Sequence, residues 1–296
     1  MKQERIKMIL KLGIPKGSLQ EATIRIFKKA GFNISVSSRS YFPSIDDEQI
    51  EAVMFRAQEM SRYVEDGIID CGITGSDWVK ENKSDVLSAA ELVYAKQSMK
   101  PVRWVLAVPN TSKIKTAKDL KGKKIATELV GVTKAYLKKN KIKADVEFSW
   151  GATEVKTQMG VDAIVEVTET GSSLRANSLK IIDTVCHSTT QFIVNKKTWQ
   201  NKNKRKKIEE IIMLLKGAIE AEDKVGLKMN IEAKNLSKVL GLLPAMKKPT
   251  IAMLTEEGWY DVDTIISEAD VKRLIPLLKR AGAEGIIEYP LNKVIQ

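Results

Sequence analysis

The residue types best suited to chemistry lie together in the segment D-A-I-V-E-V-T-E-T-G-S-S, residues 162–173. An apolar run carrying Asp162 and Glu166 leads into a short polar loop. That loop consists of Glu169, Thr170, Gly171, Ser172 and Ser173. Hydroxyls and backbone N–H groups in a tight loop before a helix can bind an anion such as phosphate. The two upstream carboxylates project from one face of a strand and could bind sugar hydroxyls or a Mg²⁺-bound water. The segment therefore predicts a site for a phosphorylated sugar.

A second candidate for anion binding lies near the start of the chain, in I-P-K-G-S, residues 14–18. The order of strand, glycine turn and helix start places backbone N–H groups beside Lys16, Gly17 and Ser18. Ser18 and Glu21 have the spacing of a capping box, which predicts that Ser18 caps the helix. The same order also opens an ordinary βα unit, so this motif is compatible with a purely structural turn.

Alternating strands and helices are expected to position these residues. The predicted strands lie at residues 6–14, 50–56, 68–74, 103–108, 146–148, 161–167, 180–183 and 191–194, with helices at 57–66 and 132–139 among others. This pattern predicts an α/β architecture with mostly parallel sheets, divided into two lobes. From residue 225 onward the pattern becomes βαββαβ, which is typical of a ferredoxin-like domain.

The segment between these regions, residues 195–207, contains seven basic residues in thirteen. Such a run suits either a nucleic-acid patch or a solvated linker. Because Trp199 is its only aromatic residue, we predict a linker that leads into a helix at residues 208–221.

The composition limits the classes of function. A net charge of +12 over 296 residues favours anionic partners or reflects a lysine-rich surface that maintains solubility. Two cysteines cannot build a disulfide framework, and a single histidine nearly excludes a histidine-ligated metal centre or a His-based triad. No apolar run approaches the roughly 18 residues that span a membrane, so we expect a cytoplasmic, soluble protein.

Residues 162–177 resemble the phosphoribosyl pyrophosphate signature of the ATP phosphoribosyltransferase family, the first enzyme of histidine biosynthesis. The resemblance covers essentially the whole chain. It includes I-P-K-G-S-L at 14–19, R-Y-V-E-D-G at 62–67, D-C-G-I-T-G-S-D at 70–77 and A-V-P at 107–109. The C-terminal module is similar to that of the long, self-regulated form of the family.

The resemblance implies an α/β fold with a two-lobed, periplasmic-binding-protein-like catalytic core and a C-terminal ferredoxin-like regulatory domain. Lobe I would comprise residues 1–100 and 184–205, and lobe II, with the phosphoribosyl pyrophosphate loop, residues 101–183. A linker helix would occupy residues 206–224, and the regulatory domain residues 225–296. The implied partners are ATP, phosphoribosyl pyrophosphate, histidine as inhibitor and further copies of the chain in a dimer or hexamer, with no nucleic acid and no membrane.

The resemblance also implies roles for particular residues. Phosphoribosyl pyrophosphate would bind to the loop from Glu169 to Ser173 and to Asp162 and Glu166. The residues implied in ATP binding are Lys16, Gly17, Ser18, Arg56, Gly75 and Asp77, and those implied in catalysis are Lys16, Arg56 and Glu166. Thr250 and Ala252 would contact the inhibitor, and Mg²⁺ would be carried mainly by the substrate phosphates.

This chain departs from the family pattern at three positions. Ser18 stands where many members carry Arg, and Glu166 and Ser173 stand where Asp and Thr are common. The latter two changes keep the chemistry but alter the reach of the side chains. Two alternatives to the enzyme are a two-lobed small-molecule-binding module without catalysis and, on charge alone, an RNA-binding protein.

Overall fold

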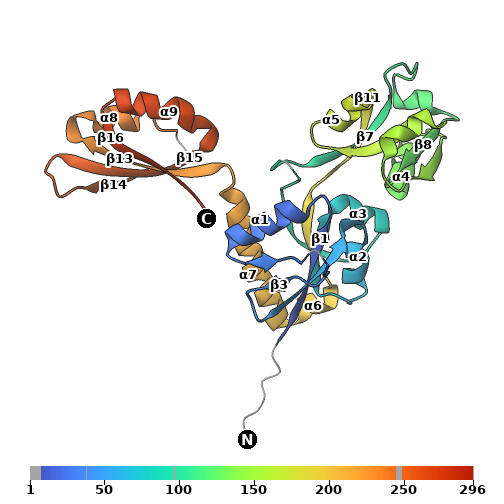
Figure 1. Ribbon diagram of the computed structural model, residues 1–296, viewed down its shortest axis with the longest axis horizontal. Coiled ribbons are helices and arrows are strands. Elements are labelled where there is room, and N and C mark those ends of the chain that lie inside the picture. Colours follow the sequence, from blue (N-terminus) through green and yellow to red (C-terminus); the bar gives the residue numbers. More distant parts are fainter. Residues whose placement is uncertain (1–7, 38, 97, 245–248, 296) are drawn as a thin grey trace, which may run out of the picture. The chain divides into compact units, whose positions relative to one another are not determined.

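The computed structural model describes residues 8–37, 39–96, 98–244 and 249–295. The chain forms two compact units, Met1–Ile212 and Met213–Gln296. The first unit is built on two separate five-stranded sheets, and the second on one four-stranded sheet (Figure 1).

The first sheet has the strand order β4-β1-β5-β12-β6. Its strands are β1 (Leu10–Lys16), β4 (Ile50–Arg56), β5 (Cys71–Gly75), β6 (Leu87–Leu92) and β12 (Thr190–Val194). Strands β1, β4 and β5 are parallel, whereas β12 runs antiparallel to both β5 and β6. The helices in this part of the chain are α1 (Gln20–Ala30), α2 (Ala57–Glu65), α3 (Ser76–Asn82), α6 (Lys196–Gln200) and α7 (Lys202–Glu220). A short ribbon of β2 (Ile34–Ser35) and β3 (Ser44–Ile45) precedes β4.

The second sheet has the order β11-β7-β10-β8-β9. Its strands are β7 (Val102–Pro109), β8 (Lys124–Thr127), β9 (Asp145–Phe148), β10 (Ala163–Thr168) and β11 (Leu179–Ser188). Strand β10 is parallel to β8 and antiparallel to β7. The intervening helices are η1 (Ala117–Leu120), α4 (Val130–Lys139), η2 (Thr153–Gln158) and α5 (Ser172–Ala176).

The chain crosses between the two sheets twice. Residues 93–101 join β6 to β7, and Thr189 alone separates β11 from β12. The first sheet contains parallel strands and the antiparallel strand β12, and the second sheet contains parallel strands and the antiparallel strand β7. Two such sheets joined by two crossings of the chain define a two-lobed, binding-protein-like core. The apolar runs of β7 and β10 account for the second lobe's core, where Trp104, Val105, Leu106 and Val165 are at most 2% exposed.

Several sequence-based expectations need correction. The sheets are mixed rather than mostly parallel, because β6, β7, β11 and β12 take part in antiparallel pairs. The capping box is wrong: α1 has Leu19 as its N-cap residue and no side-chain cap bond. Gly17 turns the chain at φ = 104°, so Ser18 lies one position too early to cap. Strand β6 was not predicted from the sequence.

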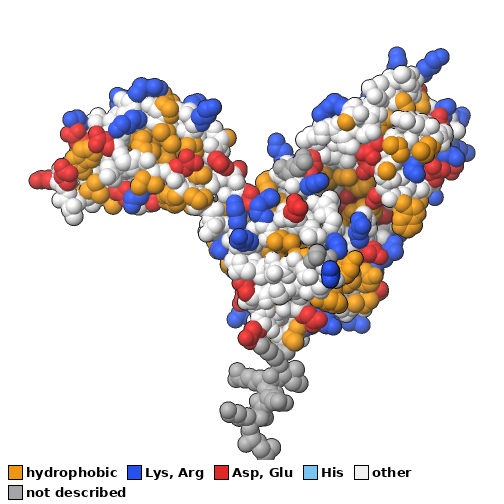
Figure 2. All heavy atoms as spheres, viewed as in Figure 1, with side chains coloured by type: hydrophobic (Ala, Val, Ile, Leu, Met, Phe, Trp, Pro, Cys, Tyr) orange, Lys and Arg blue, Asp and Glu red, His pale blue; other side chains and the backbone are white. Residues whose placement is uncertain are grey.

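The basic segment 195–207 is helical rather than a solvated linker, since it forms α6 and the start of α7. Lys204 and Lys207 form ion pairs with Asp70 and Asp47 at 2.7 and 2.5 Å. Arg205 pairs with Glu209. These three basic side chains therefore form ion pairs with acidic side chains of the same fold. On the drawn face, basic and acidic side chains are interspersed (Figure 2).

The second unit contains the βαββαβ order predicted from the sequence. Its elements are β13 (Lys224–Glu232), α8 (Ala233–Leu240), β14 (Thr250–Met253), β15 (Trp259–Ser267), α9 (Glu268–Arg280) and β16 (Ala283–Pro290). The sheet order β14-β15-β13-β16 with antiparallel pairing is ferredoxin-like. Helices α8 and α9 lie on one face of the sheet (Figure 1) and enclose a separate apolar core.

The predicted limits of the lobes and domains stay a prediction. Strand β11 continues to Ser188 in the second sheet, across the predicted boundary at residues 183 and 184. The division between the compact units falls at Ile212, inside α7. In the part of the chain that the structure describes, no helix is both long enough and apolar enough to cross a membrane.

Candidate active site

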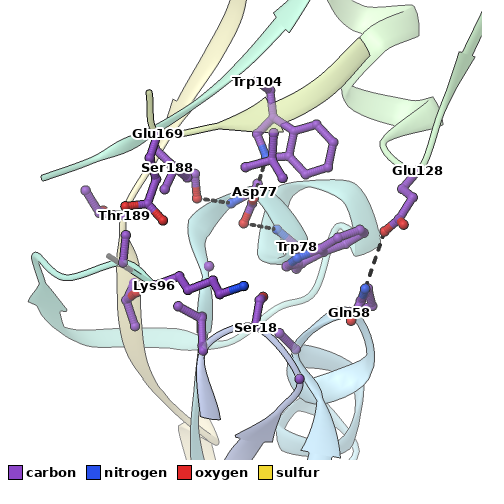
Figure 3. Close-up of a pocket in the computed structure, with 18 of the residues that line it drawn as sticks. Ser18, Gln58, Asp77, Trp78, Lys96, Trp104, Glu128, Glu169, Ser188 and Thr189 are labelled. Carbon is purple, nitrogen blue, oxygen red and sulfur yellow. Dashed lines mark hydrogen bonds between the residues drawn. The ribbon is translucent and has the colours of Figure 1, made fainter. Parts of the chain in front are cut away.

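A cavity of about 380 Å³ lies between the two lobes of the first unit. The residues around it follow the carboxyl ends of parallel strands: Ser18 after β1, Gln58 after β4, Asp77 after β5, Glu128 after β8 and Glu169 after β10. Ligands of open α/β sheets bind at this edge, because the loops there converge around the strand ends. Figure 3 shows these side chains surrounding one space.

The first lobe and the crossing segment supply three cationic residues to the cavity: Lys16, Arg56 and Lys96. The Lys16 ammonium lies 3.8 Å from the centroid of the Tyr41 ring, a cation–π contact that restricts its position. Lys96 extends into the space beside Ser18 and Trp78 (Figure 3). The three cations together favour a ligand with several negative charges.

Glu166 also lines this cavity, on the second lobe. Burial raises the pKa of Glu166 to about 7, with further contributions from the nearby Glu154 and Glu128 carboxylates, while the Val167 N–H and Thr153 hydroxyl oppose the shift. The sequence interpretation required a charged Glu166. The structure instead gives a carboxyl group that changes its protonation near neutral pH and can donate or accept a hydrogen bond.

The loop at residues 169–173 is a compact turn beside Glu166. Gly171 has φ = 76°, which favours glycine, and its N–H donates to Thr168 Oγ1 at 2.7 Å. The side chains of Thr170, Ser172 and Ser173 are exposed at the start of α5. Of this loop, only Glu169 lines the cavity itself, and the hydroxyl of Ser98 in the crossing segment donates to Glu169 at 2.8 Å.

Asp162 lies away from this site. It precedes β10, whereas Glu166 lies toward the carboxyl end, and four strand residues span about 13 Å. Asp162 accepts the Lys124 N–H at 2.9 Å and pairs with the Lys123 ammonium. These contacts lower the pKa of Asp162 below its usual value. The structure thus uses Asp162 to join β10 to β8 and does not bring it to the cavity.

Asp77 is in the cavity lining, but its carboxylate is 4% exposed and engaged in the fold. One oxygen accepts the Trp78 N–H at 2.9 Å, and the other accepts the Trp104 indole N–H at 2.5 Å (Figure 3). Gly75 leaves room for this arrangement, because a Cβ there would lie 2.0 Å from an Asp77 oxygen. Both residues therefore shape the cavity through the backbone and through Trp104.

A second contact between the lobes involves Glu81 of α3. Its two carboxylate oxygens accept the N–H groups of Gly131 and Val132 at 2.7 and 2.8 Å. A carboxylate at the start of α4 also complements the dipole of that helix. Gln58 of the first lobe likewise donates to Glu128 of the second at 3.3 Å. These bonds hold the two lobes in the arrangement that forms the cavity.

The predicted regulatory residues, Thr250 and Ala252, lie on β14 of the second unit. All four residues of β14 are exposed, and the strand is at the edge of its sheet. Thr250 is opposite Asp263 and Ala252 is opposite Asp261 in the neighbouring strand. The nearby positions 245–248 lie outside the described residues.

Sequence reasoning missed Lys96, Gln58 and Glu128. No local pattern distinguishes them: Lys96 lies in a connection between sheets, and the other two simply follow strand ends. The rule that ligands bind beyond the carboxyl ends of strands could have indicated Gln58 and Glu128 once the strands were predicted. Lys96 required the three-dimensional crossing of the chain.

The fold and this site define a two-lobed α/β protein with cationic side chains in the cleft between its lobes and an additional ferredoxin-like domain. The family described as ATP phosphoribosyltransferase matches residues 56–217, and the family described as HisG, C-terminal domain, matches residues 221–293. The chain belongs to the ATP phosphoribosyltransferase family, and its C-terminal domain indicates the long form.

Full-length relatives agree with this assignment. A protein of Solibacter usitatus named ATP phosphoribosyltransferase is 61% identical over 97% of this chain and 100% of its own length. A protein of the same name from Thermodesulfovibrio yellowstonii is 59% identical over 97% of this chain and 98% of its own length. A solved structure described as the ATP phosphoribosyl transferase (HisG:HisZ) complex from Thermotoga maritima has a TM-score of 0.59 and 27% identity, covering 70% of this chain and 98% of that one.

Proposed function

We propose that the protein transfers the phosphoribosyl group of phosphoribosyl pyrophosphate to N1 of ATP, the first step of histidine biosynthesis. The N1 lone pair forms a bond to the anomeric carbon, and the bond from that carbon to the pyrophosphate oxygen breaks with its electron pair leaving on pyrophosphate. The observation that carries the proposal is the cleft. In a chain of this family, the cleft combines cationic side chains with Glu169, the first residue of the loop that is proposed to bind phosphate.

The second lobe is the proposed site of the phosphoribosyl group. Thr170, Ser172 and Ser173 are exposed on either side of Gly171 at the start of α5, and hydroxyls in such a loop suit a terminal phosphate, which would take the place of Glu154 as the partner of the Ser173 hydroxyl. Glu166, whose pKa is about 7, lies toward the cavity and is the proposed partner of the ribose hydroxyls. Asp162 is not included, because it joins two strands at the other end of β10.

The first lobe is the proposed site for the pyrophosphate and the ATP phosphates. Lys16 and Arg56 are the last residues of β1 and β4, and Lys96 adds a third positive charge. Cations fixed in a cleft stabilise the negative charge that develops on the departing pyrophosphate. They also allow two mutually repelling anions to be held together in a reactive orientation. Because adenine N1 carries no proton at neutral pH, the attack requires no dedicated general base.

Mg²⁺ enters this proposal as part of the substrate. Within the described residues, no group of three or more His, Cys, Asp or Glu side chains could hold a metal ion. The phosphate oxygens of the substrates are the proposed ligands of the ion. Glu166 at the cavity can also accept a hydrogen bond from a water molecule of that ion.

The C-terminal unit is proposed to bind histidine and to inhibit the enzyme from a site outside the cleft. Its separate apolar core and its match to the C-terminal domain of the family support a distinct regulatory role. Thr250 and Ala252 on the exposed edge strand β14 remain the proposed contact. The protein is also proposed to assemble into a dimer or hexamer.

Release of pyrophosphate tests the proposed function. Purified protein with Mg²⁺ is mixed with ATP, with phosphoribosyl pyrophosphate, or with both, and pyrophosphate is measured over time. We expect release only when both substrates are present. A two-lobed binding module without catalysis would bind a ligand and release no pyrophosphate in any mixture.

A further inference from the structure

A second cavity of about 590 Å³ adjoins the first one. The two cavities share Arg56, Gln58, Trp78 and Glu128 as lining residues. The second cavity adds Arg62 from the first lobe and the aromatic residues Phe148 and Trp150 from the second. A ligand larger than phosphoribosyl pyrophosphate can therefore extend from one cavity into the other.

Trp150 is unusual because its side chain is 92% exposed. Its ring lies edge-to-face against Phe148, with centroids 4.7 Å apart and an interplanar angle of 84°. Phe148 is itself 51% exposed. A tryptophan ring this exposed adds little to a core, and two neighbouring exposed aromatic side chains in a cleft are typical of a binding surface.

The backbone that carries Trp150 is fixed. The preceding Ser149 is 2% exposed, and its N–H donates to the Thr127 carbonyl at 3.0 Å. Thr153, which donates its hydroxyl to Ser149 at 3.2 Å, is fully buried. The indole is thus presented from an anchored segment, which reduces the entropy lost when a ligand packs against it.

The position of Trp150 matches that of the other cavity residues. It follows β9 as Glu128 follows β8 and Glu169 follows β10. Strands β8, β9 and β10 are parallel neighbours, so the three side chains come from one edge of the second sheet. This is the edge where ligands of such sheets bind.

Trp150 and Phe148 offer aromatic surface to a flat ring in the second cavity. The charged side chains of that cavity are Arg56 and Arg62 together with the carboxylates of Glu59, Glu81 and Glu128, and Glu81 already accepts two backbone N–H groups. Arg56 also lines the first cavity beside Lys16 and Lys96, so a ligand with its ring on Trp150 can direct several negative charges toward these cations. A purine nucleoside triphosphate has both features. Phosphoribosyl pyrophosphate has the charges but no aromatic ring.

We propose that Trp150 is the base-stacking residue for the nucleotide substrate and selects a purine nucleoside triphosphate over other polyphosphates. This inference rests on the proposed function, in which ATP is the acceptor. The purine lies on Trp150 where the two cavities meet, and the phosphates extend toward Arg56 and Arg62. The base is thereby held beside the cavity assigned to the phosphoribosyl group.

Equilibrium binding to the full-length protein tests this inference without depending on turnover. Wild type, Trp150→Ala, Trp150→Phe and the control Trp199→Phe are titrated separately by calorimetry with ATP, with inorganic triphosphate and with phosphoribosyl pyrophosphate. Trp199 is a suitable control because it lies on α6, contacts Arg205 and lines neither cavity. Indole fluorescence during the ATP titration gives a second readout.

We expect Trp150→Ala to bind ATP about tenfold more weakly, since loss of one base–aromatic stack has an effect of this order. Trp150→Phe should recover part of the affinity. Binding of inorganic triphosphate and phosphoribosyl pyrophosphate should be unchanged in both variants. ATP should change the fluorescence of wild type and of Trp199→Phe equally, and the change should be smaller in Trp150→Phe, where Trp78 is the remaining indole common to both cavities.

Three outcomes would overturn the inference in distinguishable ways. Equal ATP affinity for wild type and Trp150→Ala would remove Trp150 from the nucleotide site while leaving phosphoribosyl transfer intact. An equal loss of affinity for ATP and inorganic triphosphate would also contradict base stacking. Failure of wild type to bind ATP at all would overturn both this inference and the proposed function.

Discussion

The Asp77 carboxylate of the first lobe accepts the indole N–H of Trp104 from the second lobe at 2.5 Å. Both side chains are buried, at 4% and 2% exposure. Asp77 was expected to contact ATP, but both of its oxygens already accept hydrogen bonds from tryptophan N–H groups. The bond links the lobes directly behind the cavity, so its first consequence should be for stability.

Asp77→Ala should lower the free energy of unfolding by about 2–3 kcal/mol, because it leaves the buried Trp104 N–H without its charged acceptor. Chemical denaturation followed by tryptophan fluorescence measures this change. Asp66→Ala, which removes an exposed carboxylate from the same lobe, should change stability by less than about 0.5 kcal/mol. A stable Asp77→Ala protein with weakened ATP binding would instead assign Asp77 to the substrate.

Gly171→Val should weaken binding of phosphoribosyl pyrophosphate at least tenfold, an order-of-magnitude expectation for a residue forced out of a left-handed conformation in the loop. A Cβ at Gly171 would also lie 2.9 Å from Arg175 Nη1. Calorimetry with phosphoribosyl pyrophosphate provides the measurement.

Gly122→Val is the matched control for this loop variant. Gly122 has a similar φ of 73°, but a Cβ there would meet nothing within 4 Å, and the residue lines neither cavity. It should cost stability without affecting ligand binding. Equal effects of the two variants on binding would show that backbone strain, rather than the loop, is responsible.

Glu166 should make the stability of the ligand-free protein depend on pH. Its pKa is about 7 in the fold, against an ordinary pKa of 4.5 for a glutamate side chain. The folded state therefore holds an extra proton between these pH values, and stability should fall as the pH rises from about 4.5 to about 7. The total change is at most on the order of 3 kcal/mol.

Glu166→Gln cannot titrate and should lose this part of the pH dependence. Urea denaturation of both proteins at pH 5.5 and pH 8.5 isolates the contribution, because all other groups are shared. Glu166→Gln should be the more stable protein at pH 8.5. Parallel pH profiles for the two proteins would contradict the raised pKa.

The sequence was sufficient to predict much of this fold, for local reasons. The apolar run at residues 161–167 has the pattern of a buried strand, and it corresponds to β10. The βαββαβ pattern of the second unit was also correct. Strand β6, with the sequence L-S-A-A-E-L, lacks the β-branched residues that mark a strand and is stabilised by pairing with β12.

The candidate site was predictable only in part. Side-chain alternation correctly predicts that Asp162 and Glu166 project from the same face of the strand. It does not show that Glu166 lies toward the carboxyl end of β10, whereas Asp162 lies just before its start. Lys96 and Glu128 approach the cavity from different lobes, and only the two chain crossings bring them together. The spacing of residues along the chain does not show that two distant residues lie close together in the fold.

Removal of residues 224–296 tests the regulatory proposal. The shortened chain should keep its two-lobed core and no longer be inhibited by histidine, because the proposed inhibitor site is removed. Its activity is compared with that of the full chain by measuring pyrophosphate release with and without histidine. Activity itself should fall if the removed unit also joins subunits.

Inhibition of the shortened chain to the same extent as the full chain would place the inhibitor in the cleft. Thermodynamic linkage gives a second test on the full chain. If histidine lowers the binding affinity of a substrate, that substrate must lower the binding affinity of histidine by the same factor.

The bond formed in the product tests the central claim most directly. ATP labelled with ¹⁵N at N1 is incubated with phosphoribosyl pyrophosphate, Mg²⁺ and the protein, and the product is examined by NMR. We predict scalar coupling between the new anomeric proton and the labelled N1, together with one pyrophosphate released for each bond formed. Pyrophosphate release without this coupling would indicate hydrolysis or transfer to another atom, and would contradict the assignment of this cleft as the site of phosphoribosyl transfer to ATP.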